Sequence, residues 1–489
     1  MSATLAAAAF GLLIAGLFWL QRDEKAHTSP VLWVPTLWFL LAASRSTTQW
    51  LQLAPTSNTP EQLLEGSPID RAVYSGLLAA GLVILLTRWS QVGRFLRANA
   101  AILLFFVYCA VSLLWSDYPE VAFKRWIKAM TDFVMVLVVL TDREPLAAVK
   151  RLIGRATFLL IPLSILFIKY YPHLGRAYGR WIGDARYTGV TTNKNTLGAI
   201  CMLFGLASVW TIIGAYKDRD DPGRTRRIAA HSVIILMVLW LFQMADSMTA
   251  FGCFLLGCGV LVATGFRFVI RWPVLVHILV ASILIVCVTV LFFGVDPGVL
   301  DAMGREATLT DRTLIWALLL SLNTDPWVGT GYEIRGGRIA PYPSMTTNAW
   351  VGTGFESFWL GPRLDVIWSA YSWKPNQAHS GYMEIFINLG WIGVGLLAYV
   401  LLSGYRAVSG RYRRGVPTGA LMLAYFVAGL AFNFTEAAFF RMMAPVWIIL
   451  LLAITRFPKS HTAETAPPVP DGGQEMAQEP FIIGFQNTT

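Results

Sequence analysis

The stretch NTLGAICMLFGLASVWTIIGA (residues 195–215) runs for 21 residues without a charged side chain. A helix needs about 20 mostly apolar residues to cross the hydrocarbon core of a bilayer, so this stretch predicts a transmembrane helix. Similar runs recur along a chain that is 55% hydrophobic and 14% charged, whereas ordinary soluble domains are about 25% charged. The runs are long and do not alternate, which favours helices over a β-barrel.

We therefore expect an all-α, polytopic integral membrane protein with about 12–13 transmembrane helices. The predicted spans are 3–20, 30–44, 71–88, 100–116, 126–141, 152–170, 195–215, 228–245, 248–266, 273–293, 382–403, 418–435 and 440–456. They divide the chain into an N-terminal bundle (1–293), a large loop (294–381), C-terminal helices (382–456) and a tail (457–489). The tail is rich in Pro and Gly and is predicted to be disordered.

Basic residues predict the orientation, because cytoplasmic loops carry an excess of Lys and Arg. They cluster in alternate loops, for example at Arg224, Arg226 and Arg227, which places the N-terminus outside and the C-terminus inside. If the short span 30–44 does not cross, the count becomes even and the N-terminus inverts. The net charge of +10 fits cytoplasmic loops and anionic lipid rather than nucleic acid.

The loops on the opposite side also hold cations, where few are expected. Arg186, Asn193 and Lys194 lie in RYTGVTTNKNTLG (186–198), which leads directly into the span 195–215. A guanidinium matches phosphate oxygens, and an ammonium adds a point charge. The start of a helix also favours an anion. Binding of a phosphate group is one interpretation; snorkelling of these side chains to lipid headgroups is the other.

Arg312 lies in the first turn of an amphipathic helix predicted over 309–322, too short to span and expected at the outer leaflet. A cation there opposes the helix dipole, so anion binding explains it better than helix stability. A pair with Asp311 or Glu306 is the alternative.

His379, in AHSGY (378–382), is the only histidine of the large loop. Histidine titrates near neutral pH and can take a proton from a sugar hydroxyl, and Glu384 could orient it; a helix-cap or interfacial histidine is the other interpretation. Trp327 belongs to a group of loop tryptophans that fit either a sugar-stacking platform or an interfacial belt. It lies in PWVGTGYE (326–333), which is repeated as AWVGTGFE (349–356); the paired glycines predict tight turns with positive φ.

The sequence contains no P-loop, HExxH, GxSxG or cysteine–histidine metal spacing, and all five cysteines fall in predicted spans. The lone DRD at 218–220 fits a solvated charge run better than a nucleotide-sugar site. No metal and no cofactor are predicted.

Several stretches, taken in order, resemble the O-antigen ligase / O-antigen polymerase superfamily, and are slightly more similar to exopolysaccharide polymerases. They are LLWSDYPE (113–120), RYTGVTTNKNTLG (186–198), DSMTA (246–250), DRTLIW with PWVGTGY (311–332), and AHSGYME with GWIG (378–393). One departure is Ser380, where the family often has asparagine.

The resemblance implies a GT-C-like, metal-independent glycosyltransferase in the bacterial inner membrane, with its active site facing the periplasm. It implies an undecaprenyl-diphosphate-linked oligosaccharide as donor and a glycan or lipid A–core as acceptor, with polysaccharide-export proteins as candidate partners. In this reading Arg186 and Arg312 hold the diphosphate and His379 is the general base. Lys194 and Arg125 are added as candidate substrate-binding residues because their charges lie in the outside loops, and not because of the resemblance.

A transporter or flippase for a lipid-linked or anionic solute is the rival class. Such proteins often show repeats and broken helices at the membrane midplane. The two halves of this chain show no clear repeat, and the polar residues gather in outside loops, which favours chemistry at the membrane surface.

Overall fold

The computed structural model describes most of the predicted spans and part of the large loop. The described residues are 2–22, 28–53, 66–178, 185–266, 272, 274–293, 315–316, 318–319, 333–335, 338–340, 348–371 and 374–457. Arg312 and Trp327 lie outside them.

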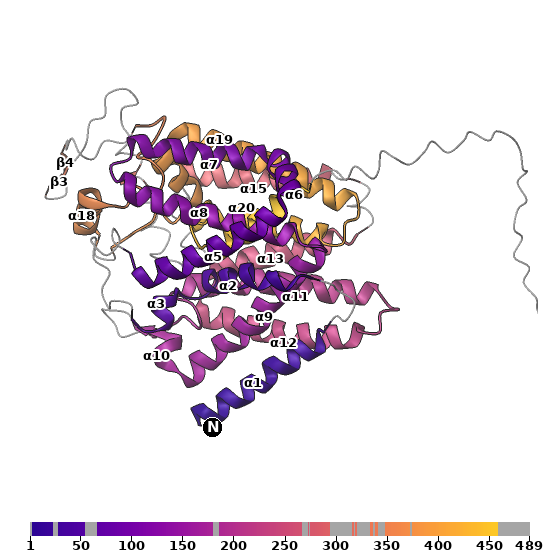
Figure 1. Ribbon diagram of the computed structural model, residues 1–489. Helices are drawn as coiled ribbons and strands as arrows, with labels where there is room; N and C mark the ends of the chain where they lie inside the picture. The colour runs from indigo at the N-terminus through magenta and orange to yellow at the C-terminus, as the bar shows by residue number, and fades with distance from the viewer. Residues whose placement is uncertain are drawn as a thin grey trace, which may run out of the picture.

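The described chain is almost entirely helical (Figure 1). Its first half contains α1 (Ala3–Leu20), η1 (Pro30–Leu32), α2 (Trp33–Ala42), α3 (Thr47–Trp50), α5 (Pro68–Thr87), α6 (Trp89–Ala98), α7 (Ala100–Val111), η2 (Ser112–Trp115), α8 (Pro119–Leu140), α9 (Pro145–Tyr170) and α10 (Pro172–Gly175). Its second half contains α11 (Lys194–Lys217), α12 (Arg224–Ala245), α13 (Met248–Ala263), α15 (Val274–Phe293), α18 (Gly361–Ala370), α19 (Gly381–Arg413), α20 (Gly419–Thr435) and α21 (Pro445–Ile454). Two antiparallel hairpins pair β1 (Arg176–Tyr178) with β2 (Ala185–Tyr187) and β3 (Glu333–Arg335) with β4 (Arg338–Ala340).

Every predicted span overlaps one of these helices. Within the described residues, six helices are long and apolar enough to cross a membrane: α1, α5, α9, α11, α12 and α19. A seventh crossing exists if α6 and α7, which meet at a bend of 86°, count as one span. The prediction of about 12–13 spans stays a prediction.

The outer surface of the bundle is apolar. Leu12 of α1 is 76% exposed, Leu86 of α5 is 65% exposed and Leu236 of α12 is 69% exposed. Long helices that keep leucines on their outer faces are stable where lipid, not water, covers those faces. The prediction of an all-α polytopic membrane protein is confirmed.

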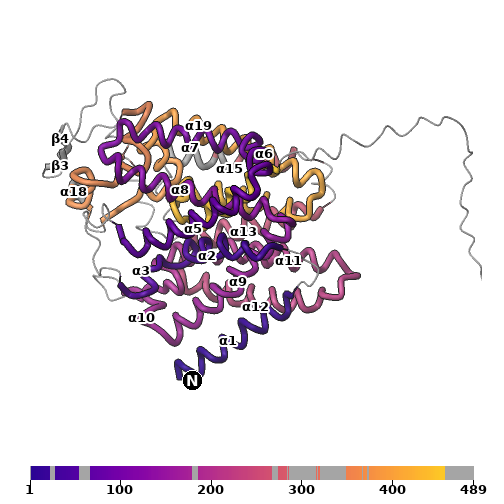
Figure 2. Tube along the Cα trace, viewed as in Figure 1, coloured from indigo at the N-terminus to yellow at the C-terminus, as the bar shows by residue number. Residues whose placement is uncertain are grey.

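The centre of the bundle is formed by α20 and α21, whose residues are buried on nearly every side. Helix α20 packs against α11, α13, α19 and α21, and α21 packs against α8. Helix α1 packs on α9 along one side only and lies at the edge of the bundle (Figures 1 and 2).

The connections gather at the two ends of the bundle. Figure 1 shows α3, α10 and α18 at one end, which we call the α10–α18 end, and α6 at the other, which we call the α6 end. The start of α19 lies at the α10–α18 end and its last turn at the α6 end. The two ends are therefore two separate surfaces, each built from several distant segments.

A loop turn locks a break in α19. Gly390 has φ +64° inside the helix, and the amides of Trp391 and Ile392 donate to the carbonyls of Ala349 and Trp350 at 2.8 and 3.1 Å. Gly352 and Gly354 adopt φ of +67° and +93°, so the predicted positive-φ turn over 349–356 is confirmed. Its twin at 326–333 is described only at Glu333.

Four residues of the helix predicted over 309–322 are described, and all four are buried. Ile315, Trp316, Leu318 and Leu319 pack in a cluster with Phe358, Trp359, Leu364 and Ile367. These apolar side chains therefore contact protein, and the loop contributes a small core of its own beside α18.

Candidate functional site

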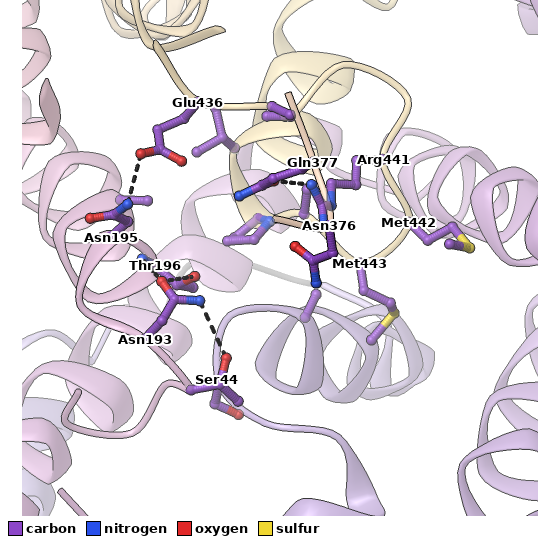
Figure 3. Close-up of a pocket in the computed structure, with 18 of the residues that line it drawn as sticks. Ser44, Asn193, Asn195, Thr196, Asn376, Gln377, Glu436, Arg441, Met442 and Met443 are labelled. Atoms are coloured by element: carbon purple, nitrogen blue, oxygen red, sulfur yellow. Dashed lines mark hydrogen bonds between the residues drawn. The ribbon is translucent and has the colours of Figure 1, made fainter. Parts of the chain in front are cut away.

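A cavity of about 670 Å³ opens at the α10–α18 end. Its walls come from segments far apart in the sequence: the α2–α3 connection, α8, the β1–β2 hairpin, the start of α11, residues 374–379 and the turn between α20 and α21. Figure 3 shows polar side chains from the last three of these facing one space, among them Asn195, Gln377, Glu436 and Arg441.

The cavity brings together four of the residues that the sequence singled out. His379, Arg186, Lys194 and Asn193 all line it. They come from two segments, residues 186–194 and the residues before α19. Arg125 and Glu384 are not among the lining residues.

His379 lies just before α19 in an unusual backbone conformation. Its φ is +51°, a region that costs free energy for a residue other than glycine and often marks functional segments. The surrounding chain holds it there, because the indole of Trp316 donates to the carbonyl of Ala378 at 2.7 Å and Ser380 caps the first turn of α19. The imidazole is 19% exposed and faces the cavity.

The carboxylate paired with His379 is Glu436. Its Oε2 lies 3.5 Å from Nδ1 of His379, and its Oε1 accepts a hydrogen bond from the amide of Asn195 at 2.7 Å. The amide nitrogen of Gln377 lies 3.3 Å from the same Nδ1. The buried carboxylate can therefore fix the orientation of the ring.

The expected partnership between His379 and Glu384 needs correction. The carboxylate of Glu384 accepts hydrogen bonds from the indole of Trp359 at 3.0 Å, the backbone amide of Ala378 at 2.5 Å and the side chain of Asn388 at 3.2 Å. Glu384 sits on the face of α19 that points into protein, so it shapes the 378–384 turn. Glu384 follows His379 by five residues, and α19 sets the direction of its side chain. Glu436 directly follows α20 and reaches His379 from there.

Close packing of α19 against α20 brings the pair together. A Cβ on Gly381 would lie 2.2 Å from Oδ1 of Asn433, so only glycine fits where the start of α19 passes the end of α20. The same Oδ1 accepts from the backbone amides of Ala438 and Phe439 at 2.9 and 2.8 Å. Asn433 thus fixes the turn that carries Glu436.

The turn between α20 and α21 also carries Arg441. Its guanidinium donates to the side-chain oxygen of Gln377, which links it to the His379 pair. Below it, the buried Asp132 of α8 accepts from the amide of Met443 at 3.3 Å and from the indole of Trp38 at 2.8 Å. A buried carboxylate with two donors anchors the turn on the bundle.

Further cations surround the cavity. Arg186 is exposed on β2, and Lys128 of α8 lies over the ring of Tyr74 at 4.5 Å. Lys194 pairs with Asp246 at 3.1 Å, so part of its charge is balanced within the protein. Asn193 caps α11 by accepting from the amide of Thr196 at 2.8 Å. The cavity is consequently positive and suited to an anionic ligand.

Arg45 positions the β1–β2 hairpin and the start of α11. Its guanidinium donates to the carbonyls of Leu174, Gly189 and Thr191. Burial lowers the pKa of Arg45 from its ordinary value, yet an arginine stays charged at any physiological pH. This residue therefore supports the site without lining it.

Arg125 belongs to a neighbouring polar cluster. It donates to the carbonyl of Glu356 and lies 4.0 Å from the carboxylate of that residue. Arg363, another cation of the outside loops, is 4% exposed and pairs with Asp117 at 3.1 Å. Both cations tie the 356–363 segment to α8 and its preceding loop.

Sequence reasoning missed Glu436, Gln377 and the role of Lys128. The available signal was a short connection after residue 435 with one carboxylate and one arginine, predicted on the same side as His379. Among the described residues, no group of three His, Cys, Asp or Glu side chains is arranged to hold a metal ion. The arrangement can bind an anion and move a proton next to it.

No protein-family model matches this chain. The chain is similar to the exopolysaccharide production protein ExoQ of Rhizobium meliloti (strain 1021), with 23% identity over 308 residues. The matched region covers 62% of this chain and 63% of the relative, so it spans less than two thirds of the relative's length. The polytopic membrane protein described here is therefore a distant homologue of an exopolysaccharide production protein.

Proposed function

We propose that this chain is a glycosyltransferase of the periplasmic face of the bacterial inner membrane. In this proposal it moves or polymerises a glycan carried on undecaprenyl diphosphate and releases undecaprenyl diphosphate. The observation that carries the proposal is the His379–Glu436 pair inside a cavity that is also lined by Arg186, Lys194, Lys128 and Arg441.

The proposed chemistry starts at His379. This step needs the proton on Nδ1, so the amide nitrogen of Gln377, which is also a donor, turns away from its 3.3 Å contact with that atom. The imidazole then donates to Glu436 and presents the lone pair of Nε2 to an acceptor hydroxyl. The hydroxyl oxygen attacks the anomeric carbon, its proton passes to Nε2, and the carbon–oxygen bond to the diphosphate breaks. Glu436 stabilises the imidazolium that forms, as the orienting carboxylate of a histidine base does.

The cations are proposed to act on the leaving group. Negative charge grows on the diphosphate as its bond breaks, and guanidinium groups already in place stabilise that charge. Arg186 and Arg441 both line the cavity, Arg186 from β2 and Arg441 from the α20–α21 turn. Arg312 is proposed for the same role from the sequence resemblance.

Polymerisation of an exopolysaccharide is the favoured form of this activity, because the distant relative is an exopolysaccharide production protein. Transfer to lipid A–core is the alternative acceptor. Both forms use the same donor and the same leaving group, so both make the same demands on the cavity.

A transporter or flippase is the second candidate function. The observation in its favour is that the cavity extends to Lys128 and Tyr74, next to the buried Asp132. Ionisable residues within membrane-spanning bundles often mark a transport pathway.

A kinetic comparison of two variants tests the enzyme proposal. His379→Asn keeps a residue that tolerates positive φ but removes the base. We therefore expect kcat to fall by about 10²–10⁴-fold, with the affinity for the undecaprenyl-diphosphate-linked glycan retained. Arg186→Ala removes a proposed contact to the diphosphate of the lipid-linked glycan, so we expect weaker binding of this substrate together with a lower kcat. Full transfer activity in His379→Asn would refute the base, and donor flipping without any transfer in the wild-type chain would favour the transporter.

A further inference from the structure

The α6 end of the bundle holds a second cavity, of about 550 Å³. Four arginines line it: Arg406, Arg411 and Arg414 from the last turns of α19 and its cap, and Arg456 from the residues after α21. Phe457 and the small side chains of Ala98 and Ala407 complete the wall. Two separate segments thus direct four positive charges to one space, and a third, the end of α6, completes it.

Two of these arginines are fixed in place by backbone carbonyls. Arg411 is 5% exposed and donates to the carbonyls of Ala453 and Thr455 at 2.7 and 2.6 Å. Arg456 donates to the carbonyl of Ser403 at 2.9 Å. The acceptors in these contacts are neutral carbonyl groups. They satisfy some N–H donors of the two arginines but do not balance the positive charge.

The backbone of Arg456 is anchored as well. Its amide donates to the side-chain oxygen of Asn99 at 2.7 Å, and its carbonyl accepts from the same amide side chain at 3.1 Å. Asn99 lies at the bend between α6 and α7. The cavity is therefore built into the junction of three helices.

The charge of the cavity is not balanced by protein in the part of the chain that the structure describes. No carboxylate lines it, and no ion pair there joins any of the four arginines to an acidic side chain. The Nε of Arg456 is buried without a hydrogen-bond partner. Arg411 is buried, whereas Arg406 and Arg414 are exposed at the end of the bundle. Like charges gathered in one place without a counter-charge are costly unless an anion completes the site.

The surroundings of the cavity match a lipid. Helix α6 turns by 86° from α7, so it lies across the end of the bundle. Tyr399 and Leu402 are 51% and 50% exposed and share a face of α19 with Arg406, at spacings of seven and four residues. An apolar stripe therefore leads from the arginines along the side of the bundle that faces lipid.

We propose that this cavity binds the phosphate group of an anionic ligand, with a phospholipid of the predicted cytoplasmic leaflet as the source that the apolar stripe favours. The four guanidinium groups match phosphate oxygens, and the stripe receives an acyl chain. This site lies at the end of the bundle opposite to His379 and does not depend on the proposed transfer reaction.

Other arginines at the same end provide the control. Arg94 on α6 and Arg413 on α19 are exposed and do not line the cavity. General attraction of a positive surface to anionic lipid would depend on them as much as on Arg406 and Arg414. Lipid binding in the cavity itself would depend on Arg406 and Arg414, which line it, and not on Arg94 and Arg413.

Native mass spectrometry of the purified full chain with added phosphatidylglycerol or phosphatidylcholine measures the binding. We expect the wild type to retain phosphatidylglycerol in preference to phosphatidylcholine, and the double variant Arg406→Gln/Arg414→Gln to lose about tenfold or more in affinity. The control Arg94→Gln/Arg413→Gln should stay within about twofold of the wild type. Equal losses in the two double variants, or no preference in the wild type, would overturn the proposal.

Competition separates the two sources of the phosphate. If the ligand is a lipid, inorganic phosphate and glycerol 3-phosphate do not displace phosphatidylglycerol at millimolar concentration. If they displace it, the phosphate site stands and its ligand is soluble. The variant Arg406→Lys/Arg414→Lys keeps both charges and should recover part of the affinity, and gel filtration confirms that all variants remain folded.

Discussion

At the level of single residues, His379 and Glu436 form the centre of the proposed site because two segments are held at close range. Glu436 is buried and fixed by Asn195, and His379 is kept at positive φ by its neighbours. The sequence predicts His379 as a candidate because it is the only histidine of the large loop. It does not predict Glu436, because the contact depends on how α19 and α20 pack.

A neutral isostere at Glu436 tests the pair. Glu436→Gln retains an oxygen for Asn195 but cannot stabilise an imidazolium, so we expect kcat to fall by about 10²-fold or more with little change in KM. Steady-state kinetics of undecaprenyl diphosphate release provide the measurement. Glu120→Gln, which removes an exposed carboxylate in the first turn of α8, is the control, and an equal loss in both variants would contradict the assignment.

The buried amide of Asn433 tests how the turn is held. Asn433→Ala removes the acceptor for two backbone amides, and buried donors left without partners cost about 1–3 kcal/mol each. We expect a lower unfolding temperature together with reduced activity, because the turn carries Glu436 and Arg441. Thermal unfolding of the purified chain measures the first effect, and unchanged stability would show that the turn is held by other contacts.

At the level of helices and loops, the spans can be predicted because runs of apolar residues and the bilayer thickness determine them. Each predicted range overlaps a helix. The break in α19 and the 86° bend between α6 and α7 could not be predicted, since both depend on contacts with distant segments. The pairs that Arg125 forms with Glu356 and Arg363 forms with Asp117 were missed for the same reason.

The break in α19 gives a prediction about glycine. Gly390→Ala places a Cβ about 2.2 Å from the carbonyl carbon of Trp350 at a φ of +64°, so we expect a loss of about 1–3 kcal/mol. Gly395→Ala in the same helix meets nothing within 4 Å and should be neutral or stabilising by up to about 1 kcal/mol. Thermal unfolding of the two variants distinguishes them, and similar unfolding temperatures would contradict the described packing of the 349–352 turn.

At the level of the whole molecule, the two ends of the bundle carry different cavities. The end with His379 combines an imidazole–carboxylate pair with cations, and the opposite end gathers arginines alone. The charge pattern of the sequence predicts which end faces the cytoplasm, because basic loops are retained there. It cannot predict that four of those arginines share one cavity, since they come from separate segments.

Reporter fusions test the predicted orientation. Green fluorescent protein at the C-terminus should fluoresce, because that end is predicted to be cytoplasmic. Alkaline phosphatase joined after residue 20 should be inactive, because the first span is predicted to run from outside to inside. An active phosphatase there would mean that the N-terminus is inverted, as it would be if the span 30–44 does not cross.

The most direct measurement is transfer in a reconstituted system. Purified chain in liposomes is given an undecaprenyl-diphosphate oligosaccharide, with and without lipid A–core, and the products are separated on a gel. We predict a ladder of longer glycans without added acceptor, and no ladder with His379→Asn. A single product that requires lipid A–core would identify a ligase instead. No transfer by a folded wild-type chain, or transfer that survives in His379→Asn, would contradict the account.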